Sequence, residues 1–132
     1  MKLRAINSAE VYETKSKGFS QGIFLPGMQL GFLSGQVAWD CNRSLPTGMD
    51  LSLEAELAMK NIHTLLKSEG RSFDDIVMLR VYLVDLTREK VMQVSGKINT
   101  FFPGNHKPAS TMVGISSLAH KDLNLEIEAI FA

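Results

Sequence analysis

Apolar and polar positions along the chain follow two patterns, one typical of strands and one typical of helices. Two apolar runs, residues 20–25 and 30–37, flank the sequence Pro26-Gly27-Met28-Gln29, whose turn composition predicts a β-hairpin. After a polar loop, apolar residues recur at helical spacing over residues 52–66, and Gly70 follows where a helix would stop. The first half of the chain therefore predicts two strands followed by a helix.

The second half repeats the alternation between strand and helix. Residues 76–84, IVMLRVYLV, are almost continuously apolar and rich in β-formers, which indicates a central strand. Apolar residues then recur at helical spacing from Thr87, a predicted N-cap, as far as Pro103-Gly104. Two further strands are predicted at residues 110–115 and 123–132. The predicted order is β-β-α-β-α-β-β, with one further strand allowed near the N-terminus.

The predicted central strand is apolar on both faces. Alternation directs one set of side chains toward the helices, namely Val77, Leu79, Val81 and Leu83. The opposite set consists of Ile76, Met78, Arg80, Tyr82 and Val84. Two helices cover only one face of such a sheet, and the other face is too apolar to lie simply in water. We therefore infer that a second subunit covers it.

The predicted last strand, LNLEIEAIFA, carries two acids within an apolar run. Alternation separates Leu123, Leu125, Ile127, Ala129 and Phe131 from a mixed face of Asn124, Glu126, Glu128 and Ile130. The mixed face is either solvated or in contact with a ligand or another subunit. In a cleft between subunits, burial would raise the pKa of Glu126 toward the value that a general acid needs.

Length and charge narrow the range of functions. The 132 residues fit one domain, residues 1–132, with a core of useful size. Fourteen acidic and fourteen basic residues balance, so neither a nucleic-acid partner nor a membrane partner is expected. The N-terminal residues lack the apolar stretch of a signal peptide, and a cytoplasmic protein is expected. Cys41 is the only cysteine and is interpreted as a bystander thiol.

The remaining motifs do not predict a metal or phosphate site. The three histidines, His63, His106 and His120, lack metal-ligand spacing and are expected at the surface. Gly31 and Gly35 in GFLSGQ lack the spacing and the lysine of a phosphate loop. Glycines inside a strand more often allow a close backbone approach, and this is the expectation here.

Four segments together carry a resemblance to a known family: LSGQVAWD, AMKNIHTLLKSEGRSFDDIVMLRVYLVDL, KPASTMVGISSL and LEIEAIFA. Their features resemble the RidA family of reactive-intermediate deaminases in order and spacing: the helix ending in EG, Asp74-Asp75, Asp85, Pro108-Ala109 and EIEA. The resemblance implies an α+β, chorismate-mutase-like fold with a mixed sheet and two helices on one face. It further implies a homotrimer with three small-molecule clefts between subunits. Active members hydrolyse enamines or imines derived from amino acids to ammonia and a 2-oxo acid, without metal or organic cofactor.

The resemblance also assigns site residues, and several depart from the family pattern. Glu126 lies at the position of the family's catalytic-site glutamate, and the Ser34-Gly35-Gln36 segment would form a cleft wall. Ser110 stands where active members have the arginine that binds the substrate carboxylate. Phe19 replaces a usual tyrosine, and Ser95 replaces a frequent asparagine. The acid is therefore present while the polar contacts to substrate are lost or weakened.

Two functions remain open from the sequence. One is a deaminase with an altered substrate; the other is a non-catalytic, ligand-binding or protein-stabilising trimer of the same fold. Arg80 could supply the missing cation, or it could form an ion pair between subunits with Glu126 or Glu128. Ribonuclease activity ranks last because the chain has neither a basic groove nor a paired arrangement of histidines. The sequence does not specify the ligand.

Overall fold

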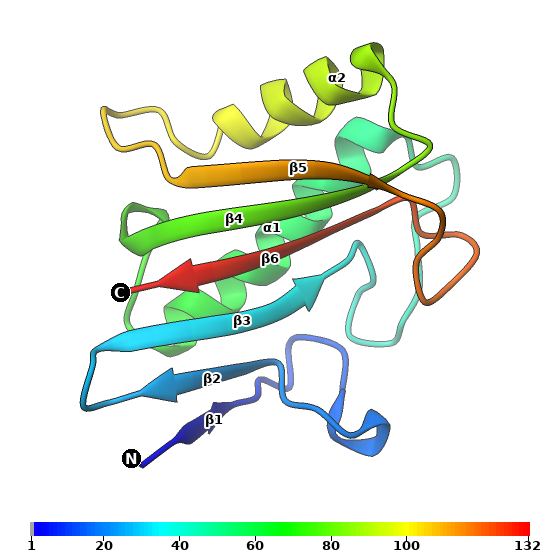
Figure 1. The fold of residues 1–132 in the computed structure, drawn as a ribbon. Coiled ribbons are helices and arrows are strands. Elements are labelled where there is room, and N and C mark those ends of the chain that lie inside the picture. Colours follow the sequence, from blue (N-terminus) through cyan, green and yellow to red (C-terminus); the bar gives the residue numbers. More distant parts are fainter. Residues whose placement is uncertain (1) are drawn as a thin grey trace.

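A computed structural model describes residues 2–132 as a six-stranded sheet with two helices (Figure 1). The strands are β1 (Arg4–Ile6), β2 (Gly22–Leu25), β3 (Leu30–Gln36), β4 (Ile76–Val84), β5 (Ala109–Ile115) and β6 (Leu125–Phe131). The helices are α1 (Leu51–Ser68) and α2 (Arg88–Asn99), with short 3₁₀ turns at Lys15–Lys17 and Phe73–Asp75. The predicted β-β-α-β-α-β-β order is confirmed, and β1 is the additional N-terminal strand.

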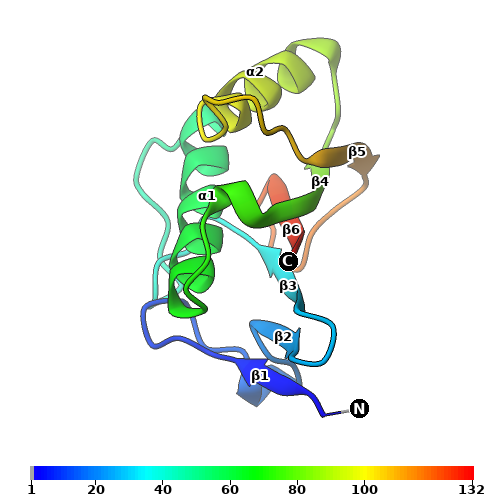
Figure 2. The same cartoon turned by 90° about the vertical axis from the view of Figure 1, so that its left-hand side faces the viewer.

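The order of strands across the sheet is β1-β2-β3-β6-β4-β5. Neighbouring strands are antiparallel except for β4 and β5, which run parallel and are connected through α2. The strand latest in the sequence, β6, therefore lies between β3 and β4. Both helices cover the same face, as Figure 2 shows, and this agrees with the predicted architecture. We call the other face of the sheet the open face.

Local sequence signals account for the boundaries of these elements. The hairpin between β2 and β3 pairs Leu25 with Leu30, and Gln29 closes the turn with a φ of 50°. The Asp50 side chain accepts a hydrogen bond from the Leu53 amide at 2.8 Å and caps α1. Thr87 caps α2 in the same way, accepting from the Lys90 amide at 3.2 Å, as the sequence predicted.

The core lies between the helices and the sheet face that they cover. From β4 and β6 it takes Leu79, Val81, Leu83, Leu125, Ile127, Ala129 and Phe131, all buried. From α1 it takes Ala55, Ala58, Met59, Ile62, Leu65 and Leu66. The alternation predicted for the last strand is thus confirmed, with its apolar face in the core and its mixed face on the open side.

The predicted facing of the first two residues of β4 is wrong. Ile76 was expected to face away from the helices, yet its side chain is only 1% exposed and belongs to the core. Val77 was expected to face the helices, yet it is 48% exposed. The pairing of β4 with β6 shifts register between Ile76 and Met78, so strict alternation is broken there. From Leu79 onward the predicted alternation holds.

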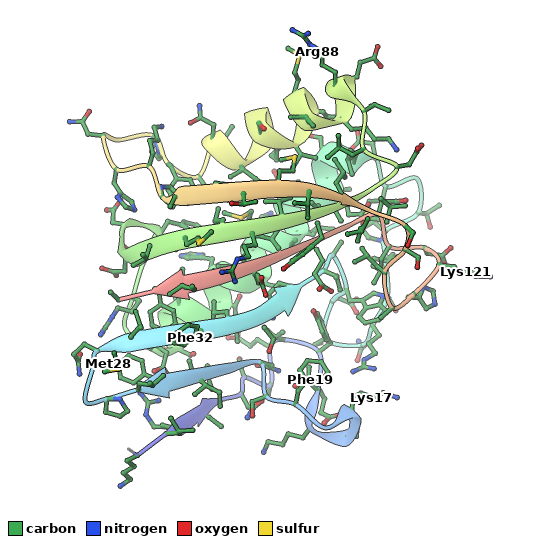
Figure 3. The ribbon with its side chains drawn as sticks, in the orientation of Figure 1. Lys17, Phe19, Met28, Phe32, Arg88 and Lys121 are labelled. Carbon is green, nitrogen blue, oxygen red and sulfur yellow. The ribbon has the colours of Figure 1, made fainter. Side chains whose placement is uncertain are left out.

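The open face is largely apolar, as expected. Half-buried apolar side chains on it include Met78 and Ile130, while Phe32 and Val113 are each 41% exposed. Figure 3 views this face with Phe32 on β3 near its middle. Within residues 2–132, no helix is both long and apolar enough to cross a membrane.

Candidate functional site

Glu126 projects from β6 on the open face and lies against the backbone of Gly35 on β3. Pairing between β3 and β6 shifts register between Leu33 and Gln36, so the chain is irregular at Ser34 and Gly35. A Cβ atom added to Gly35 would come within 2.6 Å of Glu126 Cδ. The expected close approach at this glycine is therefore confirmed, because a larger residue would overlap the carboxylate. Irregularities of this kind often re-aim a side chain next to a site.

Two hydrogen bonds hold Ser34 in place where the pairing of β3 with β6 is irregular. The Ser34 amide donates to the Gln21 carbonyl at 2.9 Å, and its hydroxyl donates to the Ser20 carbonyl at 2.7 Å. Ser20 directly follows Phe19, whose side chain is 48% exposed (Figure 3). These contacts bring the Phe19 segment to the strand that carries Ser34 and Gly35.

The buried side chain of Tyr12 holds the irregular backbone of β3 on the C-terminal side of Ser34. Its hydroxyl donates to the Gly35 carbonyl at 3.4 Å and accepts from the Val37 amide at 3.2 Å. Burial is the main cause that raises the pKa of Tyr12 to about 12, and the charge of Glu126 contributes to this rise. Tyr12 is therefore a neutral, fixed phenol that holds the backbone beside the Glu126 carboxylate.

The two acids of β6 have different surroundings. Glu128 accepts a hydrogen bond from the Tyr82 hydroxyl at 2.6 Å and pairs with Arg80 at 3.3 Å. Glu126 has no hydrogen-bond or ion-pair partner within residues 2–132, although Tyr82 lies directly opposite it across the strands. Burial, and then the charge of Glu128, raise the pKa of Glu126 above its usual value. Glu126 is thus a carboxyl group that holds its proton more tightly than an ordinary glutamate.

Arg80 lies beside Glu128 of the same chain. The sequence left open whether it binds a ligand or forms an ion pair between subunits with Glu126 or Glu128. The structure instead places its Nη1 3.3 Å from Glu128 Oε1 of the same chain. The hydrogen bond from Tyr82 to the same oxygen raises the pKa of the tyrosine. Arg80, Tyr82 and Glu128 therefore form one polar cluster next to Glu126.

Ser95 and Ser110 lie elsewhere, in a pocket between α2 and β5. The register of β4 and β5 places Ser110 beside Leu79, on the face that the helices cover. The pocket has a volume of about 230 Å³ and is lined by Leu79, Ser95, Ile98, Asn99, Phe102, Lys107, Pro108, Ser110 and Met112. We call it the α2–β5 pocket. The predicted site residues thus form two groups on opposite faces of the sheet, with Ser34, Gly35, Arg80 and Glu126 on one side and Ser95 and Ser110 on the other.

The histidines are all exposed and lie apart, as expected. His63 stacks on Phe73, His106 bonds to the Ile76 carbonyl at 2.9 Å, and His120 packs edge-on against Trp39. Cys41 is likewise exposed. The part of the chain that the structure describes contains no group of three side chains suited to a metal ion.

Sequence reasoning missed the role of Tyr12 and the hydrogen bond between Tyr82 and Glu128. Tyr82 and Glu128 were both placed on the open face, but the register that brings them together is a tertiary property. Tyr12 lies outside any periodic segment, so no pattern in the sequence marked it.

The fold and the site together define a protein of the chorismate-mutase-like class with a protonatable glutamate on the open face of its sheet. The family model described as Endoribonuclease L-PSP matches residues 13–132. The chain therefore belongs to this family, which is the RidA family that the sequence motifs resemble.

Relatives and solved structures agree with this assignment. A RutC family protein of Pyrococcus abyssi is 31% identical over 99 residues, which cover 75% of each chain. TdcF of Escherichia coli, whose name only suggests a reactive intermediate deaminase, is 28% identical over 126 residues, 92% of this chain and 95% of its own. Its crystal structure with bound serine superposes with a TM-score of 0.85 at 25% identity and covers 98% of both chains. The yeast protein YEO7 has the same fold, with a TM-score of 0.88 at 24% identity over 99% of this chain and 98% of its own.

Proposed function

We propose that this protein hydrolyses an enamine or imine, using Glu126 as its acid and base, and that its substrate differs from that of arginine-bearing relatives. One observation supports this most directly. Glu126 is half-buried against Gly35 and has a raised pKa, while the neighbouring acid Glu128 is already engaged by Tyr82 and Arg80. A carboxyl group with a raised pKa is suited to transfer protons near neutral pH.

The proposed reaction needs one carboxyl group and one water molecule. Protonated Glu126 gives its proton to the carbon of the enamine double bond, which produces an iminium ion. The resulting carboxylate then takes a proton from water as the oxygen attacks the iminium carbon. Glu126 then donates this proton to the nitrogen of the adduct, the carbon–nitrogen bond breaks to release ammonia, and the adduct's hydroxyl returns its proton to Glu126 as the carbonyl group forms. Glu126 thus acts first as an acid and then as a base, and no redox partner is required.

We further propose that the complete site forms between subunits of a homotrimer. In one chain, Glu126 and Gly35 lie on the open face, while Ser95 and Ser110 line the α2–β5 pocket on the helix side. Two faces of one sheet cannot approach each other, whereas the faces of two copies can. The apolar, uncovered open face, which includes Phe32 and Val113, supports such packing.

The altered substrate follows from Ser110. A hydrogen bond to a charged group contributes about 1.5–3 kcal/mol, so loss of an arginine contact weakens carboxylate binding roughly tenfold to a hundredfold. A serine hydroxyl can form a neutral hydrogen bond but not the two-pronged contact of a guanidinium group. The substrate is therefore held differently from the substrates of arginine-bearing relatives. That TdcF was crystallised with serine supports a small ligand for this site as well.

To test the proposal, enamines derived from amino acids are generated enzymatically in the assay, and the release of ammonia and oxo acid is followed. On these substrates we expect the wild-type protein to be slower than an arginine-bearing relative. On a panel of other enamines and imines, we expect it to hydrolyse at least one. Glu126→Gln should abolish that activity. A wild-type protein inactive on the whole panel, or activity unchanged in Glu126→Gln, would contradict the proposal.

The second candidate is a non-catalytic trimer that binds a small ligand, and the neutral Ser110 favours it. Native mass spectrometry of the purified protein would reveal a retained ligand. Ribonuclease activity ranks third because the charges balance and the three histidines lie apart. A cytoplasmic location remains our prediction, although one relative, MMF1 of Saccharomyces cerevisiae, is named as mitochondrial.

A further inference from the structure

A further pocket lies beyond the end of β3, and Glu126 and Gly35 are not among its lining residues. It has a volume of about 490 Å³ and is lined by Trp39, Arg43, Leu45, His120 and Asp122. The first three come from the loop after β3 and the last two from the loop between β5 and β6, at the same end of the sheet (Figure 1). We call it the Trp39 pocket. Small-molecule sites have this size, and they likewise combine an apolar wall with a few polar groups.

Arg43 brings an unpaired positive charge to this pocket. Its guanidinium group lies over the rings of Trp39 and Tyr12, 5.4 and 5.8 Å from their centres, and it donates to the Glu13 carbonyl oxygen. The Glu13 carboxylate is itself held by Ser16, through the amide at 2.6 Å and the hydroxyl at 2.7 Å. Across residues 2–132, no carboxylate lies within 4.0 Å of the guanidinium nitrogens of Arg43. Most of its donors are therefore free for a ligand.

The loop around Arg43 holds this residue in position. The Asp40 carboxylate accepts hydrogen bonds from the amides of Asn42 and Ser44, at 2.8 and 2.9 Å, and the Arg43 amide donates to the Asp40 carbonyl at 3.0 Å. Arg43 has a φ of 61°, a left-handed conformation that is unfavourable for a residue with a side chain. Its contacts with the two rings restrict the side chain further. A guanidinium group fixed in this way loses little freedom when it binds a carboxylate.

Asp122 brings a negative charge to the same pocket. Among residues 2–132, the one basic side chain within 4.0 Å of its carboxylate is that of His120, whose Nδ1 lies 3.8 Å away. This nitrogen accepts a hydrogen bond from the Asp122 amide at 3.2 Å, so it carries no proton and the ring is neutral. Arg43 and Asp122 are too far apart to form an ion pair with each other. The pocket therefore offers a ligand one cation and one anion, and neither is neutralised.

This pair of opposite charges restricts the class of ligand. A simple anion would be attracted by Arg43 but repelled by Asp122, and a simple amine would meet the reverse arrangement. An α-amino acid carries a carboxylate and an ammonium group on one carbon atom, so it can satisfy both charges. Trp39 and Leu45 favour an apolar side chain on that carbon.

We propose that the Trp39 pocket binds a free amino acid with an apolar side chain. Arg43 holds its carboxylate, Asp122 holds its ammonium group, and Trp39 and Leu45 receive its side chain. This inference goes beyond the proposed function, because it gives the protein a second ligand site whose lining residues differ from those around Glu126.

Trp39 is the only tryptophan of the chain, so its fluorescence reports directly on occupancy of the pocket. L-phenylalanine is titrated beside two analogues that each lack one charge: phenylalaninamide, without the carboxylate, and N-acetylphenylalanine, without the ammonium group. We expect L-phenylalanine to bind the wild-type protein roughly tenfold more tightly than either analogue, or better. Equal binding of the three compounds, or no binding of L-phenylalanine, would overturn the proposal.

Two variants test the two charges separately. Arg43→Gln should weaken binding of L-phenylalanine roughly tenfold or more and leave phenylalaninamide unchanged, because only the carboxylate loses its partner. Asp122→Asn should weaken L-phenylalanine to a similar extent and leave N-acetylphenylalanine unchanged. Arg88→Gln is the matched control and should change nothing, because Arg88 is an exposed arginine of α2, a helix that contributes no residue to the pocket (Figure 3).

The outcomes are independent of the deaminase assay, because binding is measured without any enamine. A variant that weakens all three compounds alike would contradict the role given to its charge. Thermal unfolding, measured for each variant beside Arg88→Gln, shows whether such a loss comes from a damaged fold. If a variant does not fold, the comparison of the three compounds on the wild-type protein still decides the proposal.

Discussion

Gly35 and Glu126 are in direct contact across β3 and β6, and the carboxylate occupies the space where a side chain at position 35 would begin. Gly35 is not among the glycines with positive φ, which are Gly18, Gly48 and Gly70. Glycine is therefore required at position 35 because Glu126 occupies the adjacent space, and not because of the backbone conformation of Gly35. The position of the Glu126 carboxylate thus depends on the absence of a side chain at residue 35.

Gly35→Ala should disturb the site more than the fold. A Cβ at this position overlaps the Glu126 side chain, which can rotate away, so we expect the free energy of unfolding to fall by only about 1 kcal/mol. The displaced carboxylate should lower the deamination rate roughly tenfold or more. Rate and chemical unfolding measured together check this. Gly104→Ala, where a Cβ meets open space, is the control and should change neither quantity. A large loss of stability with an unchanged rate would contradict the assignment.

Glu126→Gln should change how stability depends on pH. Burial and the charge of Glu128 raise the pKa of Glu126 above 4.5, so the folded protein binds this proton more tightly than the unfolded chain does. The stability that this group contributes is therefore present at low pH and is lost as pH rises through the raised pKa. We expect Glu126→Gln to melt at a higher temperature than the wild type at about pH 8, with little difference near pH 4. Melting curves across this range test the prediction, and a constant difference at all pH values would refute it.

Ser110→Arg should increase activity on amino-acid-derived enamines. The new guanidinium group would enter the α2–β5 pocket and could bind a substrate carboxylate through two hydrogen bonds. We expect kcat/KM to rise roughly tenfold to a hundredfold. Adding Glu126→Gln to this variant should abolish the gain. A wild-type rate equal to that of arginine-bearing relatives would show that another residue already holds the carboxylate fully.

Tyr82→Glu tests whether the open face is covered by another subunit. The substitution places an unpaired charge beside Glu126 and Glu128 on the open face, where burial would make it costly. We expect light scattering to show a shift from trimer toward monomer, with the circular dichroism spectrum nearly unchanged. Tyr82→Phe removes only the hydroxyl and should still assemble. A wild-type monomer at micromolar concentration, or a Tyr82→Glu trimer with unchanged melting, would count against this interface.

Glu54→Ala should destabilise the fold strongly. This α1 residue is 1% exposed, and its carboxylate accepts from the amides of Asn124 and Leu125, at 2.7 and 3.2 Å, and from the Asn124 side chain. Removing the acceptor leaves buried donors at the start of β6 unsatisfied, which costs roughly 2–4 kcal/mol in free energy of unfolding. Urea denaturation measures this loss. Glu89→Ala, an exposed acid of α2, is the control and should cost less than about 1 kcal/mol.

Periodicity predicted the fold well because burial itself is periodic. Three features each depend on a short stretch of sequence, and each is confirmed: the apolar face of α1, the Thr87 cap of α2 and the alternation of β6. The error at Ile76 and Val77 has a different origin, since a shift in pairing with β6 leaves no mark on the composition of β4. A local pattern specifies which residues are buried only as long as the register stays regular.

The candidate site was harder to predict because it depends on contacts between distant segments. Glu126 was identified from its place in an apolar strand and from the family resemblance, but its contact with Gly35 depends on the irregular pairing of β3. The separation of Ser110 from Glu126 follows from the parallel register of β5 on β4, which no single segment encodes.

The central position of β6 in the sheet affects how the chain folds as it is synthesised. This strand emerges from the ribosome after the other five, yet it alone joins β3 to β4. Until residues 125–131 are free to pair, the β1-β2-β3 ribbon and the β4-β5 pair cannot join into one sheet, and the part of α1 that packs on β6 stays uncovered. Because Glu126 arrives on the same strand, the sheet and the catalytic candidate are completed in one step, and a chain interrupted before β6 has neither.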